Sequence, residues 1–300
     1  MASALVRELV NAGIHFGHRV SRWNPKMAPY IFGKRNMIHI IDIRETVKGL
    51  LRAKKYLAQV VANGQDVLFV GTKRQAKQLV QDYASKCGMH SVSERWLGGT
   101  LTNFRTIRSR LSRLVELEEM ESSGAIQEFS KKRVSSLLRE KKKIARNLDG
   151  VRNMGRLPGV LFVIDPRKEH IAVKEARKLG IPTVCLLDTD ADPDYADIPI
   201  PGNDDAIRSI EIVLRELAGA VEEGKRGRVV ARETTRDAAP AQEAVAAAAA
   251  SPARRRIRRA PEGAAEQQPQ AQAPAEIVIP AAEPEAPAAA PLGEPGQPNP

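Results

Sequence analysis

Short apolar runs alternate with helical segments along the middle of this chain, and this pattern constrains its fold most. Each apolar run precedes a stretch of helical periodicity: 66–70 precedes 72–86, 159–164 precedes 168–179, and 181–187 precedes 204–222. Apolar runs of this length are typical of buried strands when helices separate them. Strands that are apolar on both faces form parallel sheets covered by helices on each side. We therefore predict an α/β fold with a doubly wound parallel sheet.

Residues 105–148 interrupt this alternation. They predict two helices, 105–121 and 125–148, which turn at Ser122-Ser123-Gly124. Apolar residues form a stripe along both helices: Leu111, Leu114, Val115 and Leu117 on the first, and Val134, Leu137, Leu138 and Ile144 on the second. This stripe suits an inserted antiparallel hairpin of the coiled-coil type. The alternative is a pair of crossover helices packed on the sheet, and the high charge density favours the hairpin.

The last third of the chain differs from the rest in composition. The last aromatic residue is Tyr195, and twelve of the 20 prolines lie beyond Asp237. A segment with so few large apolar groups cannot bury enough surface to offset its ordering entropy. We expect an α/β domain formed by residues 1–104 and 149–224, a helical hairpin at 105–148, and a disordered low-complexity Ala/Pro-rich tail at 225–300.

Positive charge is concentrated in two blocks of the expected folded part. Residues 1–55 hold 11 Lys and Arg against three acids, and residues 105–152 hold 13 against seven. The formal net charge of the whole chain is +11, with a sequence pI near 9.8. Such uneven charge favours a polyanionic partner bound at particular surfaces. The alternative is a generally basic solubilising surface, which would spread its charge evenly.

The cellular compartment is predicted from cysteine usage and from hydropathy. Cys87 and Cys185 are far apart and form no Cys-x-x-Cys pair, which fits a reducing compartment. No apolar stretch approaches the roughly 18 residues of a membrane span, and the N-terminus has no secretory pattern. We expect a cytoplasmic protein with no membrane contact.

The chain shows little sign of catalytic chemistry. Residues 70–73 follow a strand and open a helix, but the Gly-x-x-x-x-Gly-Lys-Ser/Thr spacing of a phosphate loop is absent. The aspartates at 188–194 begin like a calcium loop, but prolines occupy its sixth and twelfth positions. His15 and His18 have metal-ligand spacing without a third ligand nearby in sequence. We therefore predict no catalytic residue and no required cofactor.

One acidic cluster remains as a candidate metal site. Asp188 ends a predicted strand, and Asp204 and Asp205 open the next helix, so the fold would bring the three carboxylates together. Three carboxylates can hold a magnesium ion with several waters. The alternative is that Asn203 and Asp204 simply cap the helix.

The N-terminal basic block is the best candidate for binding nucleic acid. Arg19, Arg22 and Lys26 can reach phosphates, Trp23 offers a stacking face for an unpaired base, and the proline after Asn24 keeps the chain extended. Trp23 could instead be a core anchor. The further candidates for RNA contact are Asn24, Lys34, Arg35, Lys73, Arg74, Arg95, Trp96, Asn103 and Arg105.

Several motifs resemble those of the bacterial small-subunit ribosomal protein two family. They are AGIHFGH at 12–18, WNPKM at 23–27, YIF at 30–32, IID at 40–42, VLFVGTK at 67–73, RWLGGTLTNF at 95–104, PGVLFVIDP at 158–166 and IPGNDDAI at 200–207. The match runs in order from about Leu5 to Leu217 with similar spacing. Two departures are Ala28-Pro29, where the family commonly has a basic residue before the proline, and Asp190, where asparagine is usual.

The resemblance implies a flavodoxin-like sheet bearing a coiled-coil hairpin, and a structural rather than enzymatic role in the small ribosomal subunit. It also implies contacts with small-subunit ribosomal RNA and with other small-subunit proteins, including ribosomal protein one, which recruits messenger RNA. The competing hypothesis is a nucleotide- or metal-dependent enzyme on the same fold. Saturable binding of a nucleotide would favour the enzyme, and co-sedimentation with small subunits would favour the ribosomal protein.

Overall fold

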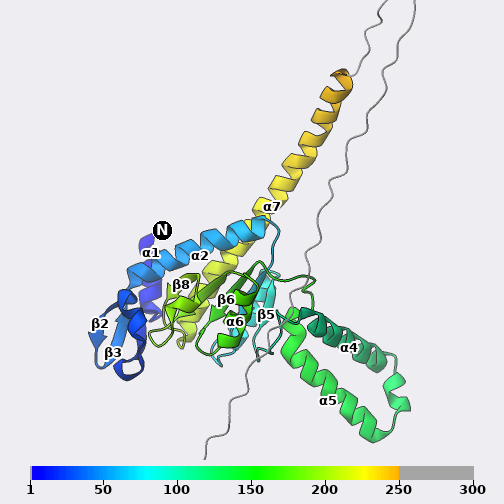
Figure 1. The fold of residues 1–300 in the computed structure, drawn as a ribbon, viewed down its shortest axis with the longest axis horizontal. Coiled ribbons are helices and arrows are strands. Elements are labelled where there is room, and N and C mark those ends of the chain that lie inside the picture. Colours follow the sequence, from blue (N-terminus) through cyan, green and yellow to red (C-terminus); the bar gives the residue numbers. More distant parts are fainter. Residues whose placement is uncertain (1, 250–300) are drawn as a thin grey trace, which may run out of the picture. The chain divides into compact units, whose positions relative to one another are not determined.

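A five-stranded parallel sheet forms the centre of the computed structural model, which describes residues 2–249 (Figure 1). Its strands are β4 (Val67–Val70), β5 (His90–Val92), β6 (Val160–Ile164), β7 (Thr183–Leu187) and β8 (Ile198–Pro201). They lie in the order β5-β4-β6-β7-β8, and every neighbouring pair is parallel. This is the strand order of flavodoxin-like folds, so the predicted doubly wound sheet is confirmed.

Alternate residues of the central strands supply the two faces of the core. Val67 and Phe69 point to the side covered by α1 (Ala2–Asn11), α2 (Ile43–Ala62), α3 (Lys77–Lys86) and α7 (Ile207–Ala249). Leu68 and Val70 point to the opposite side, where α6 (His170–Lys178) and the loop around Trp96 pack. Both faces are buried, which explains why these strands are continuously apolar.

Two short strands of this sheet were not predicted. β5 has only three residues, and β8 contains two prolines in the sequence Ile-Pro-Ile-Pro. Both lie at the edges of the sheet, where one side of the strand needs no partner. Proline, which has no N–H to donate, is tolerated at such an edge.

The basic N-terminal segment folds as a second, antiparallel sheet. Its strands are β1 (Phe16–Arg19), β2 (Ile31–Arg35) and β3 (Ile38–Ile41), in the order β1-β3-β2. Between β1 and β2 the chain forms two 3₁₀ turns, η1 (Val20–Arg22) and η2 (Pro25–Tyr30). The prediction of an extended strip around Trp23 is therefore corrected: Pro25 begins a 3₁₀ turn, capped by the Asn24 side chain, which accepts from the Lys26 N–H at 3.0 Å.

The insertion at 105–148 forms an antiparallel helical hairpin. Its helices are α4 (Phe104–Ser122) and α5 (Lys131–Leu148), joined through the 3₁₀ turn η3 (Ala125–Glu128), and η4 (Asp149–Val151) returns the chain to β6. The base of the hairpin belongs to the core beside the sheet, and a small separate core of Leu117, Ile126 and Leu137 holds its outer half together. Figure 1 shows α4 and α5 projecting beyond the β5 edge of the sheet.

The last helix is longer than predicted. α7 continues to Ala249 instead of ending near residue 222, so the expected tail boundary at 225 is wrong for residues 225–249. Lys225 donates from its Nζ to the carbonyl of Cys87 at 2.5 Å, and the continuing sequence is rich in alanine, which has the highest helix propensity. The predicted disorder of residues 250–300 lies outside the described residues. No helix within 2–249 is both long and apolar enough to cross a membrane.

Candidate functional site

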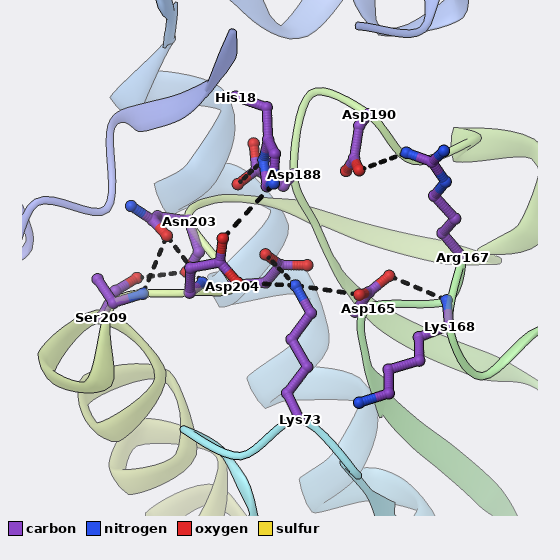
Figure 2. A network of polar contacts seen from close by, with 12 residues as sticks. His18, Lys73, Asp165, Arg167, Lys168, Asp188, Asp190, Asn203, Asp204 and Ser209 are labelled. Atoms are coloured by element: carbon purple, nitrogen blue, oxygen red, sulfur yellow. Dashed lines mark hydrogen bonds and ion pairs between the residues drawn. The ribbon is translucent and has the colours of Figure 1, made fainter. Parts of the chain in front are cut away.

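A cluster of charged side chains lies where the strands of the large sheet end (Figure 2). Lys73 follows β4, Asp165 follows β6 and Asp188 follows β7, while Asp204 and Asp205 precede α7. Because the carboxyl ends of parallel strands share one edge, residues separated by up to 132 positions in the sequence meet here. The predicted clustering of Asp188 with Asp204 and Asp205 agrees with this arrangement.

Lys73 occupies the centre of this cluster. Its Nζ lies 2.7 Å from Asp204 Oδ1, 3.0 Å from Asp205 Oδ1 and 3.0 Å from Asp165 Oδ2. Burial alone would lower the pKa of Lys73, but the neighbouring carboxylates outweigh it and raise that pKa. The predicted contact between Lys73 and an RNA phosphate is therefore corrected, because its side chain is only 15% exposed and its ammonium group is already bound by three carboxylates.

His18 reaches the same cluster from the small sheet. Its Nδ1 lies 2.9 Å from Asp188 Oδ2, and its Nε2 lies 3.5 Å from Asp205 Oδ2. The contact with Asp188 raises the pKa of His18 to about 9, against the opposing effect of burial. This close approach depends on Gly17, where an added Cβ would lie 2.5 Å from the Thr189 side chain.

Asp204 is the most constrained carboxylate of the cluster. Its side chain is 1% exposed, and its Oδ2 has no hydrogen-bond partner among the described residues. Burial raises the pKa of Asp204 to about 7, while Lys73 acts in the opposite direction. A buried acceptor without a donor is costly, and a bound cation is one way to satisfy it.

The atoms best placed to hold a metal ion differ from the predicted set. Ligand atoms of His18, Asp188 and Asp204 all lie within 4.8 Å of one another. His18 thus joins the predicted Asp188 and Asp204, whereas Asp205 is half exposed and contacts Lys73 and His18. Sequence reasoning set His18 aside because its partners lie about 170 residues away. The capping alternative holds for Asn203, whose Oδ1 accepts from the N–H groups of Asp205 and Ala206.

Seven of the predicted RNA-contacting side chains are exposed cations. None of them has a carboxylate within ion-pair distance among residues whose side chains the structure describes. They are Arg19, Arg22, Lys34 and Arg35 on the small sheet and its turns, Arg74 after β4, Arg95 after β5, and Arg105 in the first turn of α4. Asn103 is also exposed, and its Oδ1 accepts from the Thr106 hydroxyl at 2.7 Å.

Three other predicted contacts are changed by the structure. Trp96 is only 6% exposed, and its Nε1 donates to Glu175 at 3.2 Å, so the prediction that it contacts RNA is corrected. Lys26 remains exposed but pairs with Asp192 at 2.9 Å and with Asp194. Trp23 is half-buried against His39, with ring centroids 4.9 Å apart, so part of its ring covers the small sheet.

The structure also exposes three large apolar side chains in the small sheet that were not predicted from the sequence. Phe32 in β2 is 79% exposed, Met37 in the β2–β3 turn is 71% exposed and Phe16 in β1 is 47% exposed. Met37 and Asn36 both have positive φ, 60° and 51°, which places the turn in a left-handed conformation. Alternation in β2 could have indicated the exposure of Phe32, since Ile31 on the opposite face is packed against the core.

The described part of the chain thus combines a flavodoxin-like sheet, an inserted helical hairpin and a basic antiparallel sheet, the architecture of a mixed α/β protein. A model of the "Ribosomal protein S2" family matches residues 9–224. The chain is 61% identical over 249 residues to "Small ribosomal subunit protein uS2" of Rhodopirellula baltica, covering 83% of this chain and 94% of that protein. It is 50% identical over 226 residues to the protein of the same name from Syntrophobacter fumaroxidans, covering 75% and 82%.

The chain therefore belongs to the ribosomal protein S2 family of the small ribosomal subunit. This family is structural, and the chain is not an enzyme. The resemblance seen in the motifs between residues 12 and 207 is confirmed, and the competing enzyme hypothesis is set aside.

Proposed function

We propose that the chain is a structural constituent of the small subunit that binds small-subunit ribosomal RNA through its small sheet and serves on ribosomes in the cytoplasm. The observation that carries this is the group of four exposed cations, Arg19, Arg22, Lys34 and Arg35, on a sheet that the large domain holds in place. Exposed arginines bind phosphate in a bidentate way and cost little to desolvate. Other small-subunit proteins would contact the remaining surface.

Arg22→Ala tests this proposal. The full chain should co-sediment with small subunits at physiological salt. The logarithm of its binding constant for a small-subunit RNA transcript should fall linearly with the logarithm of salt concentration. Losing one phosphate contact should reduce that slope by about 0.7–0.9, with the melting temperature unchanged. Arg52→Ala, an exposed arginine on α2, is the matched control.

Two results would contradict the proposal. The first is a wild-type chain that fails to sediment with subunits. The second is an Arg22→Ala variant whose main effect is unfolding, since the side chain would then be structural.

We also propose that ribosomal protein one docks on the exposed hydrophobic surface of Phe32 and Met37. Phe32 is the most exposed large apolar side chain among the described residues, so it contributes little to folding. Exposed aromatic residues are enriched among those that dominate protein interfaces. Phe32→Ala should weaken capture of purified ribosomal protein one at least tenfold, whereas Leu51→Ala, exposed on α2, should not. Equal losses in both variants would exclude this surface.

The buried carboxylate of Asp204 supports a third proposal, that the cluster of His18, Asp188 and Asp204 binds a divalent cation. The predicted ion was magnesium, but one imidazole and two carboxylates suit zinc better. Calorimetric titration of the chelator-treated chain should show one saturable site for zinc, weaker or absent for magnesium. His18→Ala should abolish it and His170→Ala, exposed at the start of α6, should not. Equal binding in the two variants would place the metal elsewhere.

A further inference from the structure

A cleft lined by cations lies between α5 and the carboxyl ends of β4 and β6. Its volume is about 760 Å³. Four side chains of α5 form one wall: Arg139, Lys142, Lys143 and Arg146. Arg95 from the loop after β5 and Lys168 from the loop after β6 line the opposite wall. Of these residues only Arg95 was predicted to contact RNA.

The positive charge of this cleft is largely uncompensated. Arg95, Arg139, Lys142 and Lys143 have no carboxylate within ion-pair distance in the part of the chain whose side chains are described. Among the described side chains, two carboxylates line the cleft. One of them, Glu94, is shared by Lys77 and Arg146, each at 2.9 Å, and so cannot neutralise the others.

The second carboxylate is buried and already accepts a hydrogen bond. Glu169 is 4% exposed and accepts a hydrogen bond from the Thr72 hydroxyl. Burial raises the pKa of Glu169 above its usual value, against the opposing effect of the Thr72 hydrogen bond. An anion entering the cleft therefore meets several free cations and little repulsion.

The position of the cleft in the fold also points to ligand binding. After β4 the chain crosses to β5 on one side, and after β6 it crosses to β7 on the other, so the strand order reverses between β4 and β6. Ligands of open α/β sheets bind outside the carboxyl ends of the strands at this reversal. Here Lys168 bridges the two strand ends, with its Nζ donating to the Thr72 carbonyl at 3.2 Å.

The spacing of the cations selects the ligand. Arg139, Lys142, Lys143 and Arg146 recur at intervals of one to three residues along α5, spanning about 10 Å at the helical rise of 1.5 Å per residue. That span exceeds one phosphate and suits a chain of phosphates. A nucleotide pyrophosphate would need a glycine-rich loop after β4. That loop has one glycine, Gly71, and its Lys73 is bound by carboxylates.

We propose that this cleft binds successive phosphates of an RNA strand, with α5 of the hairpin as its cationic wall. The inference rests on the proposed function, because it takes RNA as the polyanion that the chain meets in the small subunit. It adds a second RNA-binding surface to that of the small sheet. It also proposes that the face of α5 that lines the cleft binds RNA.

The test compares two double variants of the full chain that remove equal charge from one helix. Lys142→Ala with Lys143→Ala removes two cations of the cleft. Lys132→Ala with Arg133→Ala removes two exposed cations of α5 outside it. Binding to a small-subunit RNA transcript is measured as a function of salt, with circular dichroism as a check on folding. The cleft variant should reduce the salt slope by about 1.4–1.8, and the control pair should leave it within error.

A second readout does not depend on the variants. RNA should protect Lys142 and Lys143 of the wild-type chain from acetylation while leaving Lys132 reactive. Wild-type RNA binding with equal slopes in both variants and no protection would overturn the cleft proposal alone. Absence of wild-type RNA binding would overturn the proposed function. Saturable binding of ATP that RNA does not displace would overturn the proposal, because the ligand of the cleft would then be a free nucleotide and not an RNA strand.

Discussion

Glu175 in α6 organises the loop that precedes the hairpin. Its carboxylate accepts hydrogen bonds from Gly99 N at 2.7 Å, Leu101 N at 3.0 Å, Thr102 N at 3.1 Å and Trp96 Nε1 at 3.2 Å. Burial would raise the pKa of Glu175, but these donors outweigh it and lower that pKa. One buried side chain thus accepts the backbone N–H hydrogen bonds that an irregular loop cannot make within a helix or sheet.

Glu175→Ala should destabilise the chain by about 3–5 kcal/mol, because it leaves several buried donors unsatisfied. Urea unfolding measures this change, and Lys174→Ala, exposed on the same helix, should alter stability by less than about 0.5 kcal/mol.

The same residue predicts the sign of a pH effect. Since the folded-state pKa of Glu175 is lowered, its stabilisation is fully present above the unfolded-state pKa and is lost as pH falls through the folded-state pKa. The difference in stability between wild type and Glu175→Ala should therefore shrink in acid. A difference that is constant from neutral pH to strong acid would show that the carboxylate charge is not involved.

At the scale of single elements, the hairpin combines two different kinds of packing. Its base is part of the core beside the sheet, whereas Leu117, Ile126 and Leu137 form an isolated core farther out. Ion pairs such as Arg113–Glu116 at 2.8 Å are exposed and contribute little. The outer half is therefore held mainly by three buried side chains.

Leu137→Ala should lower the stability of the outer hairpin by about 2–3 kcal/mol without a comparable effect on the sheet. Amide hydrogen exchange should show lost protection in residues 112–142 and unchanged protection in β6. Leu138→Ala, whose side chain is 39% exposed, is the control and should change little. Equal loss of protection in β6 would mean that the hairpin and the sheet unfold together.

For the whole molecule, the periodicity of apolar residues correctly predicted the helices and strands that local sequence determines. The bounds of α6 agree closely with the predicted helix at 168–179, because Gly180 follows its end. The central strands β4, β6 and β7 were found because burial on both faces leaves them continuously apolar. The family motifs identified the class of protein correctly.

Features that depend on pairing between distant segments were not predicted. The small sheet is half exposed, so its strands β1 and β2 mix polar and apolar residues and were not predicted as strands. His18 becomes a candidate metal ligand only because the fold brings it to Asp188 and Asp204. Trp96 is withdrawn from the surface by its hydrogen bond to Glu175. In each case the sequence alone does not show that the side chain already contacts another residue of the folded chain.

The attachment of the small sheet to the large one has a consequence for synthesis. Asn24 N donates to the Thr189 carbonyl at 2.8 Å, and His18 N donates to the Thr189 hydroxyl at 2.9 Å. Translation must add 165 residues between Asn24 and Thr189, which takes about 8–33 s at 5–20 residues per second. During that interval the basic segment emerges from the ribosome before its docking surface exists. The first cations of this chain to be made are thus among the last to reach their final positions.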